Sequence, residues 1–314
     1  MINRDIIDTQ NKMERGVCNM IKLAILGTEN SHSWYFSSIL APKTGTKVYH
    51  DVELIGVYGD KNDEKAQAGI EEIKKMSSCK RFADHYNDFL DEADAVMITA
   101  SYGARHLEYA ESYLKKGKFV WVDKPITCDP KEALKMWELA REYCAVLCGG
   151  STLRYDKTVK EISEKVQEWQ KPISGGNVSA PLINNDAYGG FWFYSQHLVE
   201  MMITIFGTDV KSVYAKKFQK GMNAVYHFDG FSVTAFYGGG FSAMVYLNGV
   251  TSVGTSFKLC EKFYEPLLDN FYKVLKDNKT DKTKKEFIAP VYIIDATIKS
   301  FTEEREVEID IPND

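Results

Sequence analysis

A lysine at the end of a short apolar run is the first residue whose position suggests chemistry. The run Lys118–Val122 is rich in β-branched and aromatic residues, which predicts a buried strand, and it ends on Asp123, Lys124 and Pro125. In open α/β sheets the ligand crevice lies outside the carboxyl ends of the strands. Lys124 therefore either presents a charge to a ligand or is a solvated strand end, and composition alone favours the second interpretation.

A second group of reactive side chains lies on a helix predicted from Trp192 to Phe206. Tyr194, His197 and Met201 recur at helical spacing and share one face. Taken by itself, His197 has the properties of a histidine satisfied within a core, and Tyr194 those of an aromatic packed between domains. If a cation such as Lys124 lowered its pKa, the Tyr194 hydroxyl could donate or relay a proton.

A glycine turn follows the first predicted strand and suggests a site for a nucleotide. The strand is Ile21–Leu26, Gly27 ends it, and a helix is predicted from Trp34 to Leu40. Ser31 or Ser33 would be the N-cap of that helix. Strand, glycine turn and helix in this order form the entry to a nucleotide-binding βαβ unit, because the helix N-terminus attracts phosphate.

The glycine fingerprint of such a unit, G-x-G-x-x-G, is incomplete in this chain. Glu29 and His32 occupy its second and third glycine positions, and Glu29 places negative charge near the expected pyrophosphate. A second predicted strand, Val52–Tyr58, is followed by Asp60, which could accept hydrogen bonds from an adenosine ribose and would favour NAD over NADP. An exposed turn acid beside Lys61 is an equally good interpretation.

The predicted elements divide the chain into two halves of different architecture. Strands alternate with helices over residues 21–150, which predicts an α/β domain with a parallel, doubly wound sheet. In residues 151–314, consecutive strand patterns without intervening helices predict an α+β domain with an open, mainly antiparallel sheet. These strand patterns are Val210–Lys217, Asn223–Phe228, Ser232–Tyr237 and Phe241–Leu247.

Length, charge and cysteine usage limit the possible classes of protein. A chain of 314 residues is long enough for two domains, and a net charge of −5 argues against nucleic-acid or anionic-membrane partners. Residues 1–20 lack the apolar region of a secretory signal, so we expect a disordered tail, a short helix or a start-site artefact. The six cysteines lack C-x-x-C spacing, which predicts free, buried thiols in a reducing cytoplasm and no metal site.

Several landmarks occur in an order that is similar to one known family. They are the strand Ala95–Ala100, His106, Gly117-Lys118, Asp123-Lys124-Pro125, the strand-end Arg154, and Tyr188-Gly189-Gly190 ahead of His197 and Glu200. Together they resemble the Gfo/Idh/MocA oxidoreductases, which include glucose–fructose oxidoreductase and inositol dehydrogenases. The spacing from His106 to Pro125 is that between the family's loop histidine and its Glu-Lys-Pro motif, with aspartate replacing glutamate. The likeness covers roughly residues 21–310.

The resemblance implies a Rossmann dinucleotide-binding domain followed by a domain for substrate binding and oligomerisation. It implies that Lys124 contacts the substrate hydroxyl, that Pro125 is often cis, and that His197 acts as acid or base. Tyr194 is a further catalytic candidate on its position alone, as a replacement for a carboxylate that the family has and this chain lacks. The expected cofactor contacts are Gly27, Thr28, Glu29, Asn30, His32, Asp60, Ser101, Tyr102, His106, Asp123 and Lys124. The expected substrate contacts are Arg154, Asn185, Asp186, Tyr194 and His197.

One departure from the family bears directly on the chemistry. Phe193 stands where the family has a catalytic aspartate, four residues before His197, and a phenylalanine can neither orient nor accept a proton. The first hypothesis is a cytoplasmic NAD- or NADP-dependent oxidoreductase acting on a sugar, polyol or similar small molecule, as a homodimer or homotetramer. The alternatives are a ligand-binding or regulatory protein without redox chemistry, and an elimination or hydrolysis assisted by the cofactor.

Overall fold

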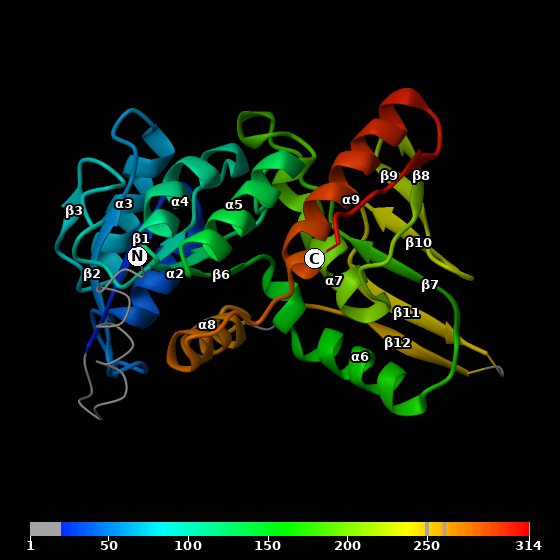
Figure 1. Ribbon diagram of the computed structural model, residues 1–314, viewed down its shortest axis with the longest axis horizontal. Coiled ribbons are helices and arrows are strands. Elements are labelled where there is room, and N and C mark those ends of the chain that lie inside the picture. Colours follow the sequence, from blue (N-terminus) through cyan, green and yellow to red (C-terminus); the bar gives the residue numbers. More distant parts are fainter. Residues whose placement is uncertain (1–19, 249–250, 260–261, 314) are drawn as a thin grey trace.

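Two β-sheets lie side by side in the structure, with helices around and between them (Figure 1). The structure is a computed structural model, and it describes residues 20–248, 251–259 and 262–313. The predictions for the leader, Cys18 and Cys260 concern residues outside these ranges. In the described part of the chain, no helix combines the length and apolarity needed to cross a membrane.

The first sheet contains six strands and is parallel throughout, as predicted. In spatial order the strands are β3 (Phe82–Ala83), β2 (Val52–Tyr58), β1 (Ile21–Leu26), β4 (Ala95–Ile98), β5 (Phe119–Val122) and β6 (Val146–Gly149). The chain builds one side of the sheet from β1 to β3 and the other side from β4 to β6. The strand order therefore reverses between β1 and β4, and a ligand crevice is expected at the carboxyl ends of these two strands.

Helices cover both faces of this sheet, because successive side chains of each strand point to opposite faces. Helices α4 (His106–Lys115) and α5 (Pro130–Glu142) pack on one face. The other face packs against α2 (Ser31–Leu40), α3 (Glu64–Met76) and α8 (Glu265–Asp277). The second half of the chain thus contributes α8 to the first core, and Tyr49 donates a hydrogen bond to Asp269 on it at 2.7 Å.

Helix α2 begins earlier than predicted, and its N-cap is a different residue. Asn30 is the N-cap, because its side chain accepts a hydrogen bond from the backbone N–H of His32 at 2.8 Å. The predicted caps, Ser31 and Ser33, lie inside the helix, where the Ser33 hydroxyl donates to the Asn30 carbonyl at 2.8 Å. The correction matters because it places His32 in the first helical turn.

The second sheet is mixed. Its spatial order is β12 (Thr251–Phe257), β11 (Phe241–Leu247), β7 (Ile173–Ala180), β10 (Ser232–Tyr237), β9 (Gly221–His227), β8 (Ser212–Phe218) and β13 (Val307–Glu308). Its pairs are antiparallel except β7 with β10, which is parallel. The four predicted strand patterns are confirmed with small shifts, whereas the polar strand β12 was not predicted.

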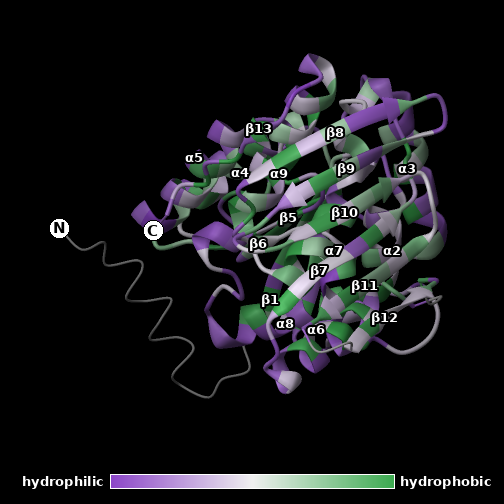
Figure 2. Cartoon of the chain, turned by 90° about the vertical axis from the view of Figure 1, so that its right-hand side faces the viewer, coloured by the Kyte–Doolittle hydropathy of each residue, from purple (hydrophilic) through white to green (hydrophobic). Residues whose placement is uncertain are grey.

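Helices α7 (Trp192–Phe206) and α9 (Lys284–Glu303) pack against one face of the second sheet, and α6 (Lys157–Trp169) lies near its β12 edge. Helix α7 has the predicted bounds. Helix α9 begins at Lys284, where Thr283 and Glu286 form a capping box, and Pro290 is accommodated inside the helix. Figure 2 shows the other face of the sheet without a helix in front of it.

The prediction of buried cysteines is only partly correct. Cys79 and Cys148 are buried and Cys128 is partly exposed, but Cys144 is exposed. Cys144 lies in the turn before β6 with a φ of +54°, so it faces solvent where the chain leaves α5. All four of these described cysteines are free thiols.

Candidate active site

The predicted reactive residues meet at the carboxyl edge of the first sheet. Strand β5 ends at Val122 and delivers Asp123 and Lys124 to this edge, and β6 delivers Ser151 beside them. Helix α7 of the second half brings His197 to the same place, where its Nδ1 lies 2.7 Å from the Ser151 hydroxyl. The site therefore lies at the junction of the two halves of the chain.

Lys124 is a buried cation without a carboxylate of its own. Its Nζ lies 4.9 Å from the ring centroid of Phe193 and 5.7 Å from that of Tyr194. No ion pair to Lys124 occurs within the described residues. Burial lowers the pKa of Lys124, although the charge of Asp123 opposes this effect. The Lys124–Pro125 peptide bond is cis, as the resemblance implied.

Asp123 forms an ion pair with His32, which is one of the predicted cofactor contacts. Its Oδ2 lies 2.6 Å from Nδ1 of His32, a short ion pair whose angles do not meet those of a hydrogen bond. Its Oδ1 accepts the backbone N–H of Lys124 at 2.7 Å. Burial would raise the pKa of Asp123, but the His32 and Lys124 charges and these contacts lower it below its usual value. Asp123 thus links His32 of α2 to residues 123–126, the loop that carries Lys124 and is called the lysine loop below.

His197 is suited to accept a proton. It is buried, and its ring packs edge-on against Tyr194 with centroids 4.4 Å apart. Burial, followed by the positive charges of Lys124 and His32, lowers the pKa of His197 well below its ordinary value, so the imidazole is neutral at neutral pH. In the tautomer that donates Nδ1–H to Ser151, Nε2 carries the lone pair that a base needs.

The hypothesis that Lys124 lowers the pKa of Tyr194 is wrong. Burial raises the pKa of Tyr194, and this phenol contacts the lysine through its ring face. Tyr194 therefore stays protonated at neutral pH, so its hydroxyl can donate or accept a hydrogen bond but is not poised to lose its proton. Phe193, at the position of the family's aspartate, covers Lys124 with an aromatic ring and supplies no charge.

Aromatic rings form much of the wall around these groups. Tyr264, just before α8, packs edge-on against His32 with centroids 4.9 Å apart and lies 5.0 Å from the Tyr35 ring. Together with Phe193 and Tyr194, these rings surround the lysine and the two histidines with apolar faces. Such faces can stack on the C–H groups of a sugar or polyol ring.

The glycine turn after β1 has the backbone that a dinucleotide requires. Gly27 has a φ of +98°, and a Cβ at this position would lie 2.4 Å from the Ala100 backbone nitrogen. The predicted cofactor contacts Thr28 and Asn30 hold the turn itself. Thr28 Oγ1 donates to the Ala66 carbonyl at 2.7 Å, and Asn30 Nδ2 donates to the Thr99 carbonyl at 2.8 Å.

Glu29 and His32 have different surroundings: Glu29 lies beside Asp63 and the backbone of the turn, whereas His32 pairs with Asp123. The Glu29 carboxyl is buried, and its Oε2 has no hydrogen-bond partner within the described residues. Burial raises the pKa of Glu29, opposed by the backbone N–H groups of Glu29 and Thr28 and supported by the nearby charge of Asp63. The backbone N–H groups of Thr28 and Glu29 lie against this carboxyl, so a dinucleotide phosphate could use them only once Glu29 is protonated or displaced.

The remaining predicted cofactor contacts fall into two groups. Asp60 follows β2 and pairs with Arg105 at 2.8 Å, and Ser101 and Tyr102 follow β4 at the same edge. His106 is fully buried, and its nitrogens lie 3.1 Å from the Ile126 carbonyl and 2.9 Å from the Ala100 carbonyl. His106 therefore clamps the lysine loop to the end of β4 and cannot touch a ligand directly.

The predicted substrate contacts are not all brought together. Arg154 forms an ion pair with Glu286 at 2.6 Å, and this pairing leaves its charge engaged away from Lys124. Asn185 and Asp186 lie in the loop before α7, where the Asn185 carbonyl accepts the Gly190 N–H at 2.8 Å. This loop crosses to the first half of the chain, because the Tyr188 ring lies 4.7 Å from Nζ of Lys65. Their roles toward a substrate stay predictions.

Polar residues that were not predicted as part of the site join α7 to the lysine loop. The backbone N–H of Ile126 donates to Gln196 at 2.9 Å, and Gln196 donates to Glu200 at 3.1 Å. Glu200 in turn pairs with Lys282 at 3.5 Å, with both side chains fully buried. The only signal for Gln196 was its place beside His197; nothing in the local pattern indicated Ser151 or Lys282.

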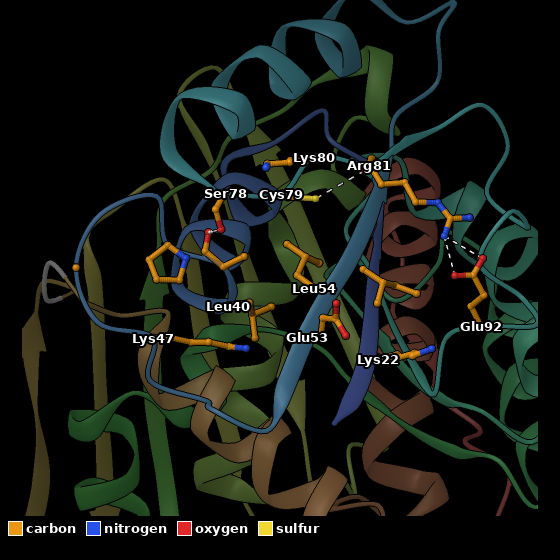
Figure 3. Close-up of a pocket in the computed structure, with 14 residues that line it drawn as sticks. Lys22, Leu40, Lys47, Glu53, Leu54, Ser78, Cys79, Lys80, Arg81 and Glu92 are labelled. Carbon is orange, nitrogen blue, oxygen red and sulfur yellow. Dashed lines mark hydrogen bonds and ion pairs between the residues drawn. The ribbon is translucent and has the colours of Figure 1, made fainter. Parts of the chain in front are cut away.

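A sizeable hollow on the surface lies elsewhere. It has a volume of about 670 Å³ and opens at the amino ends of β1 and β2, near Lys22, Lys47 and Glu53 (Figure 3). The charges around it include Arg81, which pairs with Glu92 at 2.8 Å. Since ligands of doubly wound sheets bind at the carboxyl ends of the strands, this hollow is not the candidate active site. No cluster of metal-ligating side chains occurs among the described residues.

Comparison with known proteins identifies relatives of this architecture. Residues 21–150 match the family model GFO_IDH_MocA, described as an oxidoreductase family with an NAD-binding Rossmann fold. Among solved structures, scyllo-inositol dehydrogenase of Lactobacillus casei with NAD(H) and scyllo-inositol is 16% identical, with a TM-score of 0.76 over 92% of this chain and 99% of that one. A comparison with curated protein sequences found no match.

Two further structures share the fold. GenD2 from gentamicin A biosynthesis, in complex with NAD, is 15% identical, with a TM-score of 0.76 over 93% of this chain and 97% of that one. The WlbA dehydrogenase of Chromobacterium violaceum, with NADH and UDP-GlcNAcA, is 18% identical, with a TM-score of 0.73 over 94% and 97%. At these identities the likeness concerns the fold, which extends over both halves of the chain.

Proposed function

We propose that this chain, whose residues 21–150 belong to the Gfo/Idh/MocA oxidoreductase family, is an NAD(P)-dependent dehydrogenase of a sugar, polyol or similar molecule. One observation carries the proposal: a buried lysine, without an ion pair in the part of the chain that the structure describes, and a buried histidine with a lowered pKa contact the same tyrosine at the carboxyl edge of the first sheet. Lys124 Nζ lies 5.7 Å from the Tyr194 ring centroid, and the His197 ring lies 4.4 Å from it.

The residues present fit a dinucleotide at the edge of β1 and β4. Gly27 would allow close approach of the backbone, the turn at Thr28 and Glu29 would face the phosphates, and Asp60 would meet the adenosine ribose. When bound, the nicotinamide ring supplies the site that accepts or gives a hydride. Side chains of this chain would bind the substrate oxygen and transfer its proton.

Lys124 would hold the substrate oxygen and favour its alkoxide form. An ammonium group in a water-poor cleft stabilises developing negative charge strongly, because little solvent screens it. His197 would take the hydroxyl proton as the alcohol is oxidised and return it in the reverse direction. The family's aspartate is not needed to hold a proton in this scheme, since the neutral His197 can accept it alone. Ser151 keeps the imidazole in orientation.

The substrate class rests on the walls of the cleft and on the relatives. Phe193, Tyr194 and Tyr264 would offer stacking faces to a ring, while Lys124 and His197 would bind one hydroxyl. Two of the similar structures contain scyllo-inositol and UDP-GlcNAcA, both hydroxylated rings. These observations support a sugar or polyol without naming one.

Replacing Lys124 by Ala tests this proposal. Turnover with a panel of inositols and sugars should fall by about three orders of magnitude or more, since the group that stabilises the alkoxide is lost. NADH binding, followed by nicotinamide fluorescence, should change little, because Lys124 is not part of the phosphate turn. Turnover that survives in Lys124→Ala would refute the role of the lysine.

A ligand-binding protein without redox chemistry is the second candidate. Phe193 and the buried Glu29 favour it, since the first removes a carboxylate from the site and the second occupies the phosphate turn. Titration with NADH and NADPH separates the two candidates. A protein that binds neither dinucleotide at millimolar concentration would be a ligand-binding protein of this second kind.

A further inference from the structure

A histidine and a carboxylate form a buried pair directly beside the lysine of the candidate site. His32, in the first turn of α2, places its Nδ1 2.6 Å from Oδ2 of Asp123, the residue that follows β5. In the sheet, β4 lies between β1 and β5, so the pair connects the carboxyl ends of two strands that are not neighbours. It joins the helix after β1 to the residue that precedes Lys124.

This pair and one backbone contact account for both oxygens of the Asp123 carboxylate. Oδ1 accepts the backbone N–H of Lys124 at 2.7 Å, whereas Oδ2 has His32 as its ion-pair partner and no hydrogen bond within the described residues. Asp123 is fully buried, so solvent does not replace a missing partner. A buried carboxylate without a partner is strongly unfavourable. Without His32, Asp123 would therefore need another cation.

Lys124 is the residue that could supply that cation. The charges that act on Asp123 include those of His32 and Lys124, and the charge of Asp123 acts on Lys124 in turn. Lys124 nevertheless forms no ion pair in the part of the chain that the structure describes, and its Nζ lies 4.9 Å from the Phe193 ring centroid. A buried cation and a buried carboxylate on adjacent residues attract each other strongly. They can stay apart because His32 already neutralises the carboxylate.

Packing holds His32 in the orientation that this contact requires. Its ring lies edge-on to Tyr264 with centroids 4.9 Å apart, and 5.7 Å from the ring of Phe36, one turn further along α2. The Tyr264 hydroxyl in turn lies 3.2 Å from the Ser31 hydroxyl. Since Tyr264 directly precedes α8, the second half of the chain helps to keep the imidazole beside Asp123.

We infer that His32 is a positioning residue that keeps Lys124 available for the substrate: by pairing with Asp123, it prevents an ion pair between that carboxylate and the lysine. The inference rests on the proposed function, in which Lys124 holds the substrate oxygen. It gives His32 a role that differs from the predicted contact with the cofactor. It also implies that removing the carboxylate compensates for removing the histidine.

A double-mutant cycle measures this compensation, with kcat determined at saturating NAD on a sugar or polyol that the wild type oxidises. His32→Ala should lower kcat by about a hundredfold, because Lys124 would pair with Asp123 and no longer stabilise the alkoxide. Asp123→Asn should cost less, since its amide still accepts the Lys124 N–H and attracts no cation. Adding Asp123→Asn to His32→Ala should raise kcat by at least about tenfold. If His32 only supported packing, the second substitution would bring no recovery.

A crystal structure of His32→Ala provides a measurement that does not depend on activity. Lys124 Nζ should lie within about 4 Å of a carboxylate oxygen of Asp123. His227→Ala is the matched control, because it removes a contact of a histidine with Glu306 at 3.9 Å in the second sheet. It should change neither kcat nor the position of Lys124. The dissociation constant of NADH, measured by fluorescence, should change much less than kcat in every variant.

The outcomes separate this inference from the proposed function. A His32→Ala structure in which Lys124 stays apart from Asp123, or a double variant no more active than His32→Ala, overturns the inference and leaves the dehydrogenase proposal standing. Loss of NADH binding in His32→Ala also overturns it, since His32 would then be a cofactor contact. A wild type that oxidises no sugar or polyol refutes the proposed function, and the crystal structure still decides whether His32 keeps Lys124 from Asp123. If circular dichroism shows His32→Ala to be unfolded, His32→Phe replaces it with the same expectations, because it keeps a ring against Tyr264.

Discussion

At the scale of single residues, the candidate site depends on burial, which lowers the pKa of Lys124 and of His197 and so affects which of them is charged. Burial favours the neutral form of His197, Lys124 forms no ion pair with a carboxylate of the described residues, and Asp123 pairs instead with His32 at 2.6 Å. The pKa values of the lysine and of His197 are both lowered, chiefly by burial. The site can therefore combine an electrophilic cation with a neutral base only within a limited range of pH.

The pH dependence of kcat/KM should reflect both shifts. Activity should fall on the acid side as His197 becomes protonated, and this limb should lie below the usual histidine pKa of about 6.5, because its pKa is lowered. The alkaline limb should lie below the usual lysine pKa of about 10.4, since loss of the Lys124 proton removes the cation. An acid limb above the usual histidine value would contradict the assignment of His197 as base.

Glu29 predicts a pH dependence of cofactor binding. Because its pKa is raised, the carboxyl ionises as pH rises through that raised value, and the new charge lies beside the phosphate turn. The dissociation constant of NADH should therefore increase with pH, up to about tenfold per unit above the raised pKa. Glu29→Gln should bind more tightly and without this slope, whereas the exposed Glu64→Gln control should keep it. A slope that persists in Glu29→Gln would exclude Glu29 as its cause.

At the scale of elements, α7 connects the two halves of the molecule through one polar chain. Gln196 reaches the lysine loop, and Glu200, one turn further on, pairs with Lys282 ahead of α9. A Cβ on Gly150 would lie 2.1 Å from the Glu200 carboxylate, so the backbone just after β6 packs directly against this network. Because every member is buried, losing one charge would leave its partner without compensation.

Lys282→Met should destabilise the protein far more than a surface substitution of the same type. It would leave Glu200 buried and unpaired, which costs about 3–5 kcal/mol in the free energy of unfolding. Lys299→Met, which opens the exposed Lys299–Asp295 pair, should cost at most about 1 kcal/mol. Urea unfolding gives both values, and adding Glu200→Gln to Lys282→Met should recover part of the loss. Equal costs for the two lysines would show that the Glu200–Lys282 pair is not desolvated.

At the scale of the whole molecule, the uncovered face of the second sheet is a candidate interface with a second copy of this chain. Tyr214, Phe218, Phe236 and Tyr246 are 40–45% exposed on strands β8, β10 and β11. Figure 2 shows these strands without a covering layer. The resemblance implies an oligomer formed through such a sheet, and large exposed aromatic side chains mark surfaces that partners bury.

Phe236→Glu combined with Tyr246→Glu should dissociate that oligomer. Burying two carboxylates without partners at an interface is unfavourable, so the variant should elute as a monomer in size-exclusion chromatography with light scattering. Trp169→Glu, at the end of α6 and 38% exposed, is the control and should leave the assembly unchanged. A wild type that is already monomeric would refute this interface.

Local sequence patterns predicted most of the helices and strands and which of them end in reactive residues, although the polar strand β12 was missed. The alternation of strands and helices predicted the parallel first sheet, and helical spacing predicted α7 with Tyr194 and His197 on one face. These features follow from local periodicity, because burial of one face imposes the pattern on neighbouring residues. Lys124 at the end of β5 is known from the same local information.

The partners of these residues could be read only from the folded structure. Ser151 meets His197 from 46 positions away, and Arg105 meets Asp60 from 45 positions away. The packing of α8 on the first sheet and the turn of His32 toward Asp123 depend on the arrangement of whole elements. Such contacts produce no periodic pattern in the sequence, because two polar residues can pair at any separation along the chain once the fold brings them together. For this reason Lys124 and His197 could be identified from the sequence, whereas their burial and their partners became known only from the fold.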